Sequence, residues 1–140
     1  MDRRKFIQRG CSTCVGLTGL GFLLQSCGTA LPVLKSVAEN KTFVVPVSKF
    51  EELKTSLLLI RNSQLENDIL LVKKDNAYKA LFMKCTHEGV GLTATASKIV
   101  CSAHGSVFDF DGQVVKEPAL RPLREFKTDI TDNNIIIHLT

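Results

Sequence analysis

The sequence predicts an all-β domain, because short apolar runs follow one another from residue 43 to the end of the chain. The runs are rich in β-branched residues, which is typical of strands. Turn residues separate several of them: Asp75-Asn76, Asp111-Gly112 and Asp132-Asn133-Asn134. Short runs joined by such turns favour an antiparallel arrangement, as in a small β-sandwich or barrel, over any helical fold.

Nine strands are expected, in chain order, over residues 43–47, 57–60, 69–72, 80–83, 99–101, 107–110, 114–115, 126–130 and 135–139. One helical turn is expected among them. Ser48-Lys49-Phe50-Glu51 fits a capping box, in which a serine begins a helix and a glutamate three residues later bonds back to it. This turn is expected to end near Thr55.

The first 27 residues are predicted to be an export signal, residues 28–41 a tether, and residues 42–140 the folded domain. Arg3 and Arg4 precede an apolar stretch over residues 11–24, which is the pattern of a secretory leader. The paired arginines resemble the twin-arginine class of bacterial signal. The end of the stretch resembles a lipoprotein box, in which Cys27 becomes the lipidated first residue; an uncleaved signal anchor is the alternative. The expected location is the bacterial cell envelope, at the periplasmic or outer face of the inner membrane.

The net charge of +4 does not indicate a nucleic-acid partner. The first 27 residues hold +3 of it, and the rest of the chain has 14 basic and 13 acidic residues. A nucleic-acid-binding domain needs a basic patch or stripe, and the predicted domain has none in its sequence.

Two short clusters carry the functional signal: Cys85-Thr86-His87 and Cys101-Ser102-Ala103-His104. In each, one cysteine and one histidine lie close enough for a single tight loop to reach both irons of a [2Fe–2S] cluster. Two thiolates would then hold one iron and two imidazoles the other. A tetrahedral zinc site is an alternative, although zinc fingers usually pair cysteine with cysteine along the chain. A disulfide between the two cysteines is another alternative, and it leaves both histidines unexplained.

Residues 83–109 resemble the Rieske iron–sulfur family, and residues 108–112 and 117–123 extend the resemblance over about residues 42–140. The resemblance implies stacked antiparallel sheets with two cluster-binding loops at one end. It implies one [2Fe–2S] cluster per chain, held by Cys85, His87, Cys101 and His104. It also implies that the Ser106 hydroxyl donates to a bridging sulfide, and that residues 117–123 cover a third side of the cluster.

Four positions differ from the high-potential Rieske subunits of quinol-oxidising complexes. Val90 and Ala103 stand where those subunits have two disulfide-bonded cysteines. Phe108 replaces a tyrosine that donates to a ligand cysteine, and Glu88 replaces a bulky apolar residue. Because donors to sulfur raise the reduction potential, we predict a lower midpoint potential than in that group.

The expected function is that of a membrane-tethered electron-transfer protein, which passes single electrons between redox protein partners without catalysis of its own. The alternative is a Rieske subunit of a quinol-oxidising cytochrome complex or of a molybdenum oxidoreductase. A third possibility, a Rieske fold kept only as a binding module, conflicts with the presence of all four ligands. A Rieske oxygenase is excluded because His138 is the only other histidine, too few for a second iron site.

Overall fold

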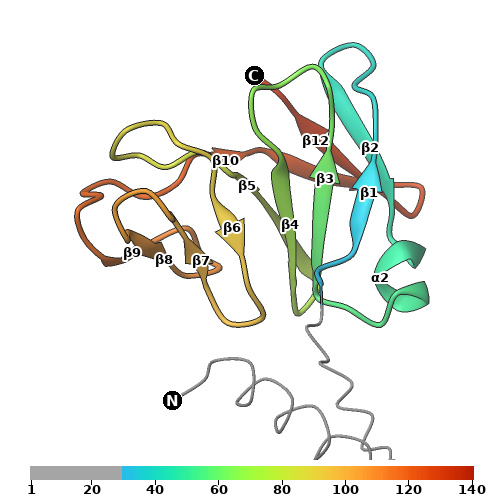
Figure 1. The fold of residues 1–140 in the computed structure, drawn as a ribbon. Helices are drawn as coiled ribbons and strands as arrows, with labels where there is room; N and C mark the ends of the chain where they lie inside the picture. The colour runs from blue at the N-terminus through green and yellow to red at the C-terminus, as the bar shows by residue number, and fades with distance from the viewer. Residues whose placement is uncertain (1–29) are drawn as a thin grey trace, which may run out of the picture.

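Three small sheets make up residues 30–140, the part of the chain that the computed structural model describes (Figure 1). The predicted signal segment, with Cys27, lies outside these residues. The strands are β1 (Val33–Lys35), β2 (Thr42–Pro46), β3 (Leu57–Arg61), β4 (Ile69–Lys74), β5 (Ala77–Phe82), β6 (Thr93–Ala94), β7 (Ile99–Val100), β8 (Val107–Phe108), β9 (Val114–Lys116), β10 (Glu125–Phe126), β11 (Thr128–Thr131) and β12 (Asn134–His138). One short helix, α2 (Ser48–Glu52), follows β2. Within residues 30–140, no helix has the length and apolar character needed to cross a membrane.

The sheets have five strands in the order β1-β3-β4-β5-β10, three in the order β11-β12-β2, and four in the order β6-β7-β8-β9. All pairs are antiparallel except β1 with β3. The predicted all-β fold is therefore confirmed.

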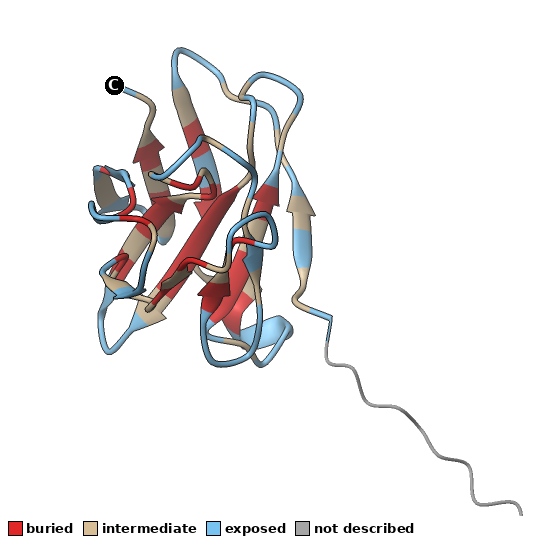
Figure 2. Cartoon of the chain, turned by 60° about the vertical axis from the view of Figure 1, so that its left-hand side comes forward, coloured by how far each residue is buried: buried red, intermediate tan, exposed pale blue. Residues whose placement is uncertain are grey.

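The five-stranded sheet is covered on both faces, which explains the unbroken apolar run of β4. Successive side chains of a strand point to opposite faces, so such a run requires a core on each side. Ile69 and Leu71 face the three-stranded sheet, whereas Leu70 and Val72 face the four-stranded sheet. Figure 2 shows the buried residues concentrated in the strands at the centre of the molecule.

The first core lies between the five-stranded and three-stranded sheets and contains Phe43, Val45, Phe50, Leu58, Ile60, Ile69, Leu71, Tyr78, Ala80, Phe126, Ile135 and Ile137. The second core lies between the five-stranded and four-stranded sheets and contains Leu57, Leu70, Val72, Leu81, Met83, Cys85, Ile99, Cys101, Phe108, Ala119 and Leu123. The two predicted ligand cysteines are thus core residues of the second core.

The predicted turn residues lie in the hairpin connections. Asp75 turns β4 into β5 with a φ of 55°, and Asp132 and Asn133 turn β11 into β12 with φ of 50° and 62°. Gly112 has a φ of 79° in the β8–β9 turn, where a Cβ would lie 3.1 Å from a methyl carbon of Leu81. Glycine therefore satisfies both the left-handed backbone and the close approach of this turn to the five-stranded sheet.

All nine predicted runs overlap an observed strand, but the run over residues 126–130 overlaps two strands in different sheets. Phe126 pairs with Ala80 in the five-stranded sheet, and Thr128–Thr131 pair with β12 in the three-stranded sheet. The chain changes sheet at Lys127, so one continuous sequence pattern serves both sheets.

The predicted tether is wrong for residues 33–35, which form β1. This strand runs parallel to β3, with Val33 opposite Leu59. The amide of Leu59 donates to the Pro32 carbonyl, and the amide of Ser36 donates to the Arg61 carbonyl. A three-residue edge strand gives no periodic signal in the sequence. Its hydrogen bonds depend on its pairing with β3, whose partner residues lie 26 positions later in the chain.

The helical turn after β2 is confirmed, but its predicted capping box is wrong. Val47 is the N-cap residue and no side chain caps the helix, so Ser48 lies inside the first turn. The amide of Val47 donates to the Asn133 carbonyl of the β11–β12 turn. This tertiary bond fixes the chain one residue before the serine and determines where the helix begins.

Candidate metal centre

The first ligand loop is closed by backbone hydrogen bonds at its cysteine. The carbonyl of Cys85 accepts from the amide of Gly89, and its own amide donates to the Val90 carbonyl, both at 2.8 Å. Gly89 has a φ of 74°, a left-handed conformation that favours glycine. The bonds hold His87 at the outer tip of the loop.

The second loop repeats this arrangement although its cysteine and histidine are one residue further apart. The carbonyl of Cys101 accepts from the amide of Gly105 at 3.0 Å, and its amide donates to the Ser106 carbonyl at 2.9 Å. Gly105 has a φ of 79°. A Cβ on Gly105 would meet no atom within 4 Å, so the backbone angle, and not lack of space, accounts for the glycine.

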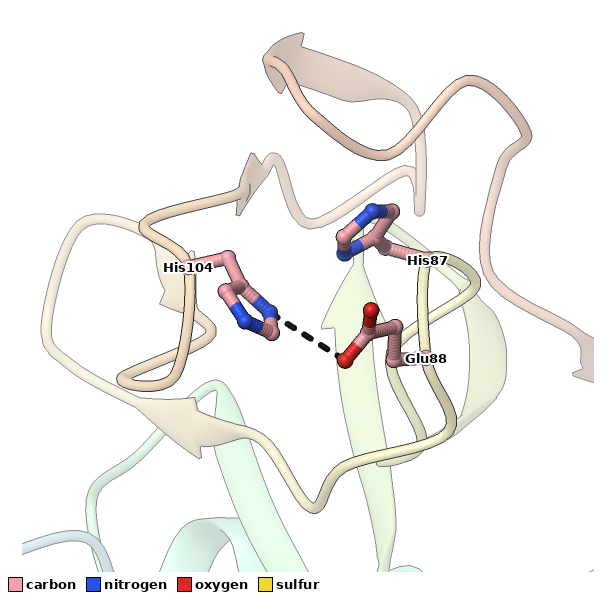
Figure 3. Close-up of side chains that lie close together, drawn as sticks. All are labelled: His87, Glu88 and His104. Atoms are coloured by element: carbon pink, nitrogen blue, oxygen red, sulfur yellow. Dashed lines mark ion pairs between the residues drawn. The ribbon is translucent and has the colours of Figure 1, made fainter.

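The two loops bring together all four predicted ligands, with the sulfurs inside and the imidazoles outside. Cys85 and Cys101 are buried and are not joined in a disulfide. The rings of His87 and His104 are exposed, with centroids 5.1 Å apart and planes at 87° (Figure 3). A buried thiol pair beside an exposed imidazole pair is the donor set that a [2Fe–2S] cluster with one inner and one outer iron needs.

The second loop also favours the thiolate form of its cysteine. Burial raises the pKa of the Cys101 thiol, and the Glu88 carboxylate raises it further. Hydrogen bonds from the backbone amides of His104 and Ala103 and from the Cys85 thiol outweigh both effects and hold this pKa below its usual value. Thiolate is the form of cysteine that binds metals.

The segment at residues 117–123 is hydrogen-bonded to both loops. The Ser106 hydroxyl is fully buried and accepts from the amide of Ala119 at 3.0 Å, which leaves its own proton for another acceptor. The Thr86 hydroxyl donates to the Arg121 carbonyl at 2.6 Å. Leu120 lies between these two attachments with its side chain 80% exposed.

Glu88 reaches from the first loop to the histidine of the second. Its carboxylate oxygen lies 3.7 Å from Nδ1 of His104 (Figure 3). The ligating atoms of His87, Glu88 and His104 lie within 4.8 Å of one another. The sequence singled out Glu88 only because high-potential Rieske subunits have a bulky apolar residue at this position. Its contact with His104 depends on how the two loops are placed in the fold, and no local sequence pattern predicts it. The same holds for the Thr86 hydrogen bond.

The third histidine of the described residues belongs to the three-stranded sheet. His138 on β12 pairs through Nε2 with the Asp129 carboxylate on β11, at 2.8 Å. Half-buried on a regular strand, it contributes to the sheet surface and not to the metal centre.

Comparisons with known proteins point to one family. Residues 42–127 match the Rieske [2Fe-2S] domain family. The chain is 25% identical to the cytochrome b6-f complex iron-sulfur subunit of Chlorobaculum tepidum, over 99% of this chain and 76% of that one. It is 40% identical to the corresponding subunit of Prochlorococcus marinus over 38% of this chain and 31% of the relative. The crystal structure of the cyanobacterial plasma membrane Rieske protein PetC3 from Synechocystis superposes with a TM-score of 0.55 at 28% identity, over 67% of this chain and 96% of that one.

Proposed function

This chain belongs to the Rieske [2Fe-2S] family, and on that basis we propose that it is a membrane-tethered carrier of single electrons between redox partners. It is a Rieske electron-transfer protein with one Rieske-type cluster per chain. The observation that carries the proposal is the pairing of buried cysteines with exposed histidines at the tip of the two loops.

Each ligand residue has a distinct task in the proposal. Cys85 and Cys101 would hold the inner iron, and His87 and His104 would hold the outer iron. When bound, the cluster takes up and releases one electron at a time. Neutral imidazoles in place of two thiolates remove negative charge, which makes reduction easier than in all-cysteine clusters. The exposed imidazole edges provide a short path to a partner, and Leu120, exposed on the segment that is bonded to both loops, offers an apolar contact.

The Ser106 hydroxyl supports the cluster from the buried side. Its oxygen is occupied by the Ala119 amide, so its proton is free to be donated to sulfur. Such a bond stabilises the more negative, reduced state. No tyrosine hydroxyl adds a second donor, because position 108 is phenylalanine, and this keeps the expected potential moderate.

The membrane tether of the proposal is a lipid on Cys27. Pro32, whose carbonyl is already bonded to β3, is only the fifth residue after Cys27. Five extended residues span at most about 18 Å, so a lipid at Cys27 would keep the domain close to the bilayer. Partners at the same membrane surface would then be within reach, and distant ones would not.

A second candidate function is that of a Rieske subunit in a quinol-oxidising complex. It is favoured by the Chlorobaculum tepidum relative, which is named as the iron-sulfur subunit of a cytochrome b6-f complex and aligns with 99% of this chain. Val90, Ala103 and Glu88 argue against it, since the disulfide cysteines and the apolar docking residue of those subunits are absent from this sequence.

Protein-film voltammetry near neutral pH separates the two functions. A midpoint in the middle of the Rieske range, which runs from roughly −150 to +300 mV, supports the carrier. A midpoint at the upper end of that range supports the quinol-oxidising subunit. Electron paramagnetic resonance of the reduced protein gives the prior check: a wild-type protein replete with iron and sulfide but without a Rieske signal would contradict the ligand assignment.

The tether is tested by fractionating cells that express the full chain or the variant Cys27→Ser. Loss of the variant from the membrane fraction, together with loss of labelling by a fatty acid, supports lipidation. An unprocessed variant that stays in the membrane at the same level as wild type supports the uncleaved anchor instead.

A further inference from the structure

The carboxylate of Glu88 is the charged group closest to the two ligand histidines among the interactions of the described residues. It follows His87 directly in the first loop and lies 3.7 Å from Nδ1 of His104 in the second. Figure 3 shows its side chain next to both imidazole rings, with a dashed line that marks the pair with His104. The first loop thereby places a negative charge beside the ligand histidines of both loops.

This charge is not neutralised by a neighbouring cation. Among the ion pairs of residues 30–140, Glu88 has no lysine or arginine partner. Lys84, the lysine of the same loop, pairs with Glu66 instead. The carboxylate side chain is 58% exposed, so water screens it in part but does not remove its field at 3.7 Å.

Glu88 is not needed as a ligand. Two thiolates and two imidazoles already supply two protein ligands to each iron of the cluster. The remaining effect of its charge is on the electron: a nearby negative charge disfavours the addition of another one, and net charge is one of the factors that set the potential of iron–sulfur clusters.

We propose that Glu88 is a tuning residue, which holds the midpoint potential of this Rieske centre down by stabilising its oxidised state. The inference rests on the ligand assignment of the proposed function. It adds a cause for a moderate potential that is independent of donors to sulfur. A carboxylate thus takes the position that high-potential subunits give to an apolar side chain.

The experiment compares Glu88→Gln, which keeps the shape and removes the charge, with wild type by protein-film voltammetry. Glu51→Gln is the matched control, because Glu51 is an exposed glutamate on α2, on the far side of the five-stranded sheet from the ligand loops (Figure 1). We expect Glu88→Gln to favour the reduced state about three- to tenfold, where tenfold equals 59 mV for one electron. Glu88→Lys should raise the midpoint further, and Glu51→Gln should leave it unchanged.

The salt dependence provides a second readout. Because an exposed charge is screened by ions, the difference between wild type and Glu88→Gln should shrink as ionic strength rises from 10 mM to 1 M, over which the screening length falls from about 30 to about 3 Å. An equal shift in Glu51→Gln, or a midpoint that falls or stays the same in Glu88→Gln, would overturn the proposal.

The electron paramagnetic resonance spectrum distinguishes failure of the tuning role of Glu88 from failure of the proposed function. A wild-type protein without a Rieske signal would refute the ligand assignment itself. A signal present in wild type and lost in Glu88→Gln would show that Glu88 is required for cluster assembly, and this would overturn its role as a tuning residue.

Discussion

The two faces of the five-stranded sheet carry cores of different kinds. On one face, β2 and β12 have five residues each and bury only aliphatic and aromatic side chains against the sheet. On the other face, β6, β7 and β8 have two residues each, and their core contains both ligand cysteines. We call the first half, with the five-stranded and three-stranded sheets, the body, and residues 83–123 the cluster lobe.

The difference indicates two sources of stability. Long paired strands with a continuous apolar core can stabilise the body by burial alone. Two-residue strands contribute little by themselves, so the cluster lobe depends on whatever joins its two loops. Where metal ligands are brought together only by folding, the free energy of metal binding becomes free energy of folding. Order in the cluster lobe should therefore depend on the cluster, whereas order in the body should not depend on it.

Cluster removal should give the largest effect. In the variant Cys85→Ser, which loses one thiolate, we expect backbone amides of residues 84–123 to exchange with solvent at least about tenfold faster, because the loops lose their common ligand. Amides of β4 and β5 should change little. Hydrogen exchange followed by mass spectrometry measures both regions in one sample.

The control for this experiment is Ser102→Ala, an exposed position in the second loop that makes no side-chain hydrogen bond among the described residues. It should keep both the cluster and the protection. Equal loss of protection in the body and the lobe of Cys85→Ser would show that the two halves form one cooperative unit and do not have separate sources of stability.

Two adjacent residues of β4 sharpen the comparison with an intermediate effect. Leu70 and Leu71 are both fully buried but face the cluster lobe and the three-stranded sheet respectively. Leu→Ala at either position should lower the free energy of unfolding by about 2–5 kcal/mol, through lost burial and the cavity left behind. Only Leu70→Ala should also speed the release of iron to a chelator, followed by visible absorbance. Equal release rates in the two variants would mean that the two cores are not independent.

The same division decides how much could be predicted from the sequence. The two cysteine–histidine clusters and most strands of the body were predictable, because a spacing of two or three residues and an apolar run are local patterns. The edge strand β1, the start of α2 at Val47 and the contact of Glu88 with His104 were not. Each depends on a contact with another part of the chain. The strand β1 pairs with β3, the amide of Val47 is bonded to Asn133, and Glu88 contacts the opposite loop.

The smallest expected effect concerns the ion pairs that join the two halves. Asp111, in the β8–β9 turn of the lobe, accepts from Lys74 of β4 at 2.9 Å and lies 3.3 Å from Nζ of Lys79 on β5. The hydrogen bonds from these two lysines lower the pKa of the Asp111 carboxyl. A carboxyl whose pKa is lowered by folding stabilises the folded state above its unfolded pKa, about 3.9, and loses that contribution as the pH falls through the folded value.

Asp111→Asn should therefore flatten the acid dependence of stability between about pH 5 and pH 2. The effect should be smaller at high salt, because Lys74 is exposed and Asp111 and Lys79 are partly exposed. Urea unfolding at pH 5 and pH 3, followed by far-ultraviolet circular dichroism, measures this slope. Asp132→Asn, an exposed turn residue for which the structure gives no ion pair, is the control and subtracts any common effect of acid on the cluster. If both variants kept the wild-type slope, the lysine–aspartate pairs would not couple the lobe to the body, and the apolar contacts of Leu70, Val72 and Leu81 would have to do so alone.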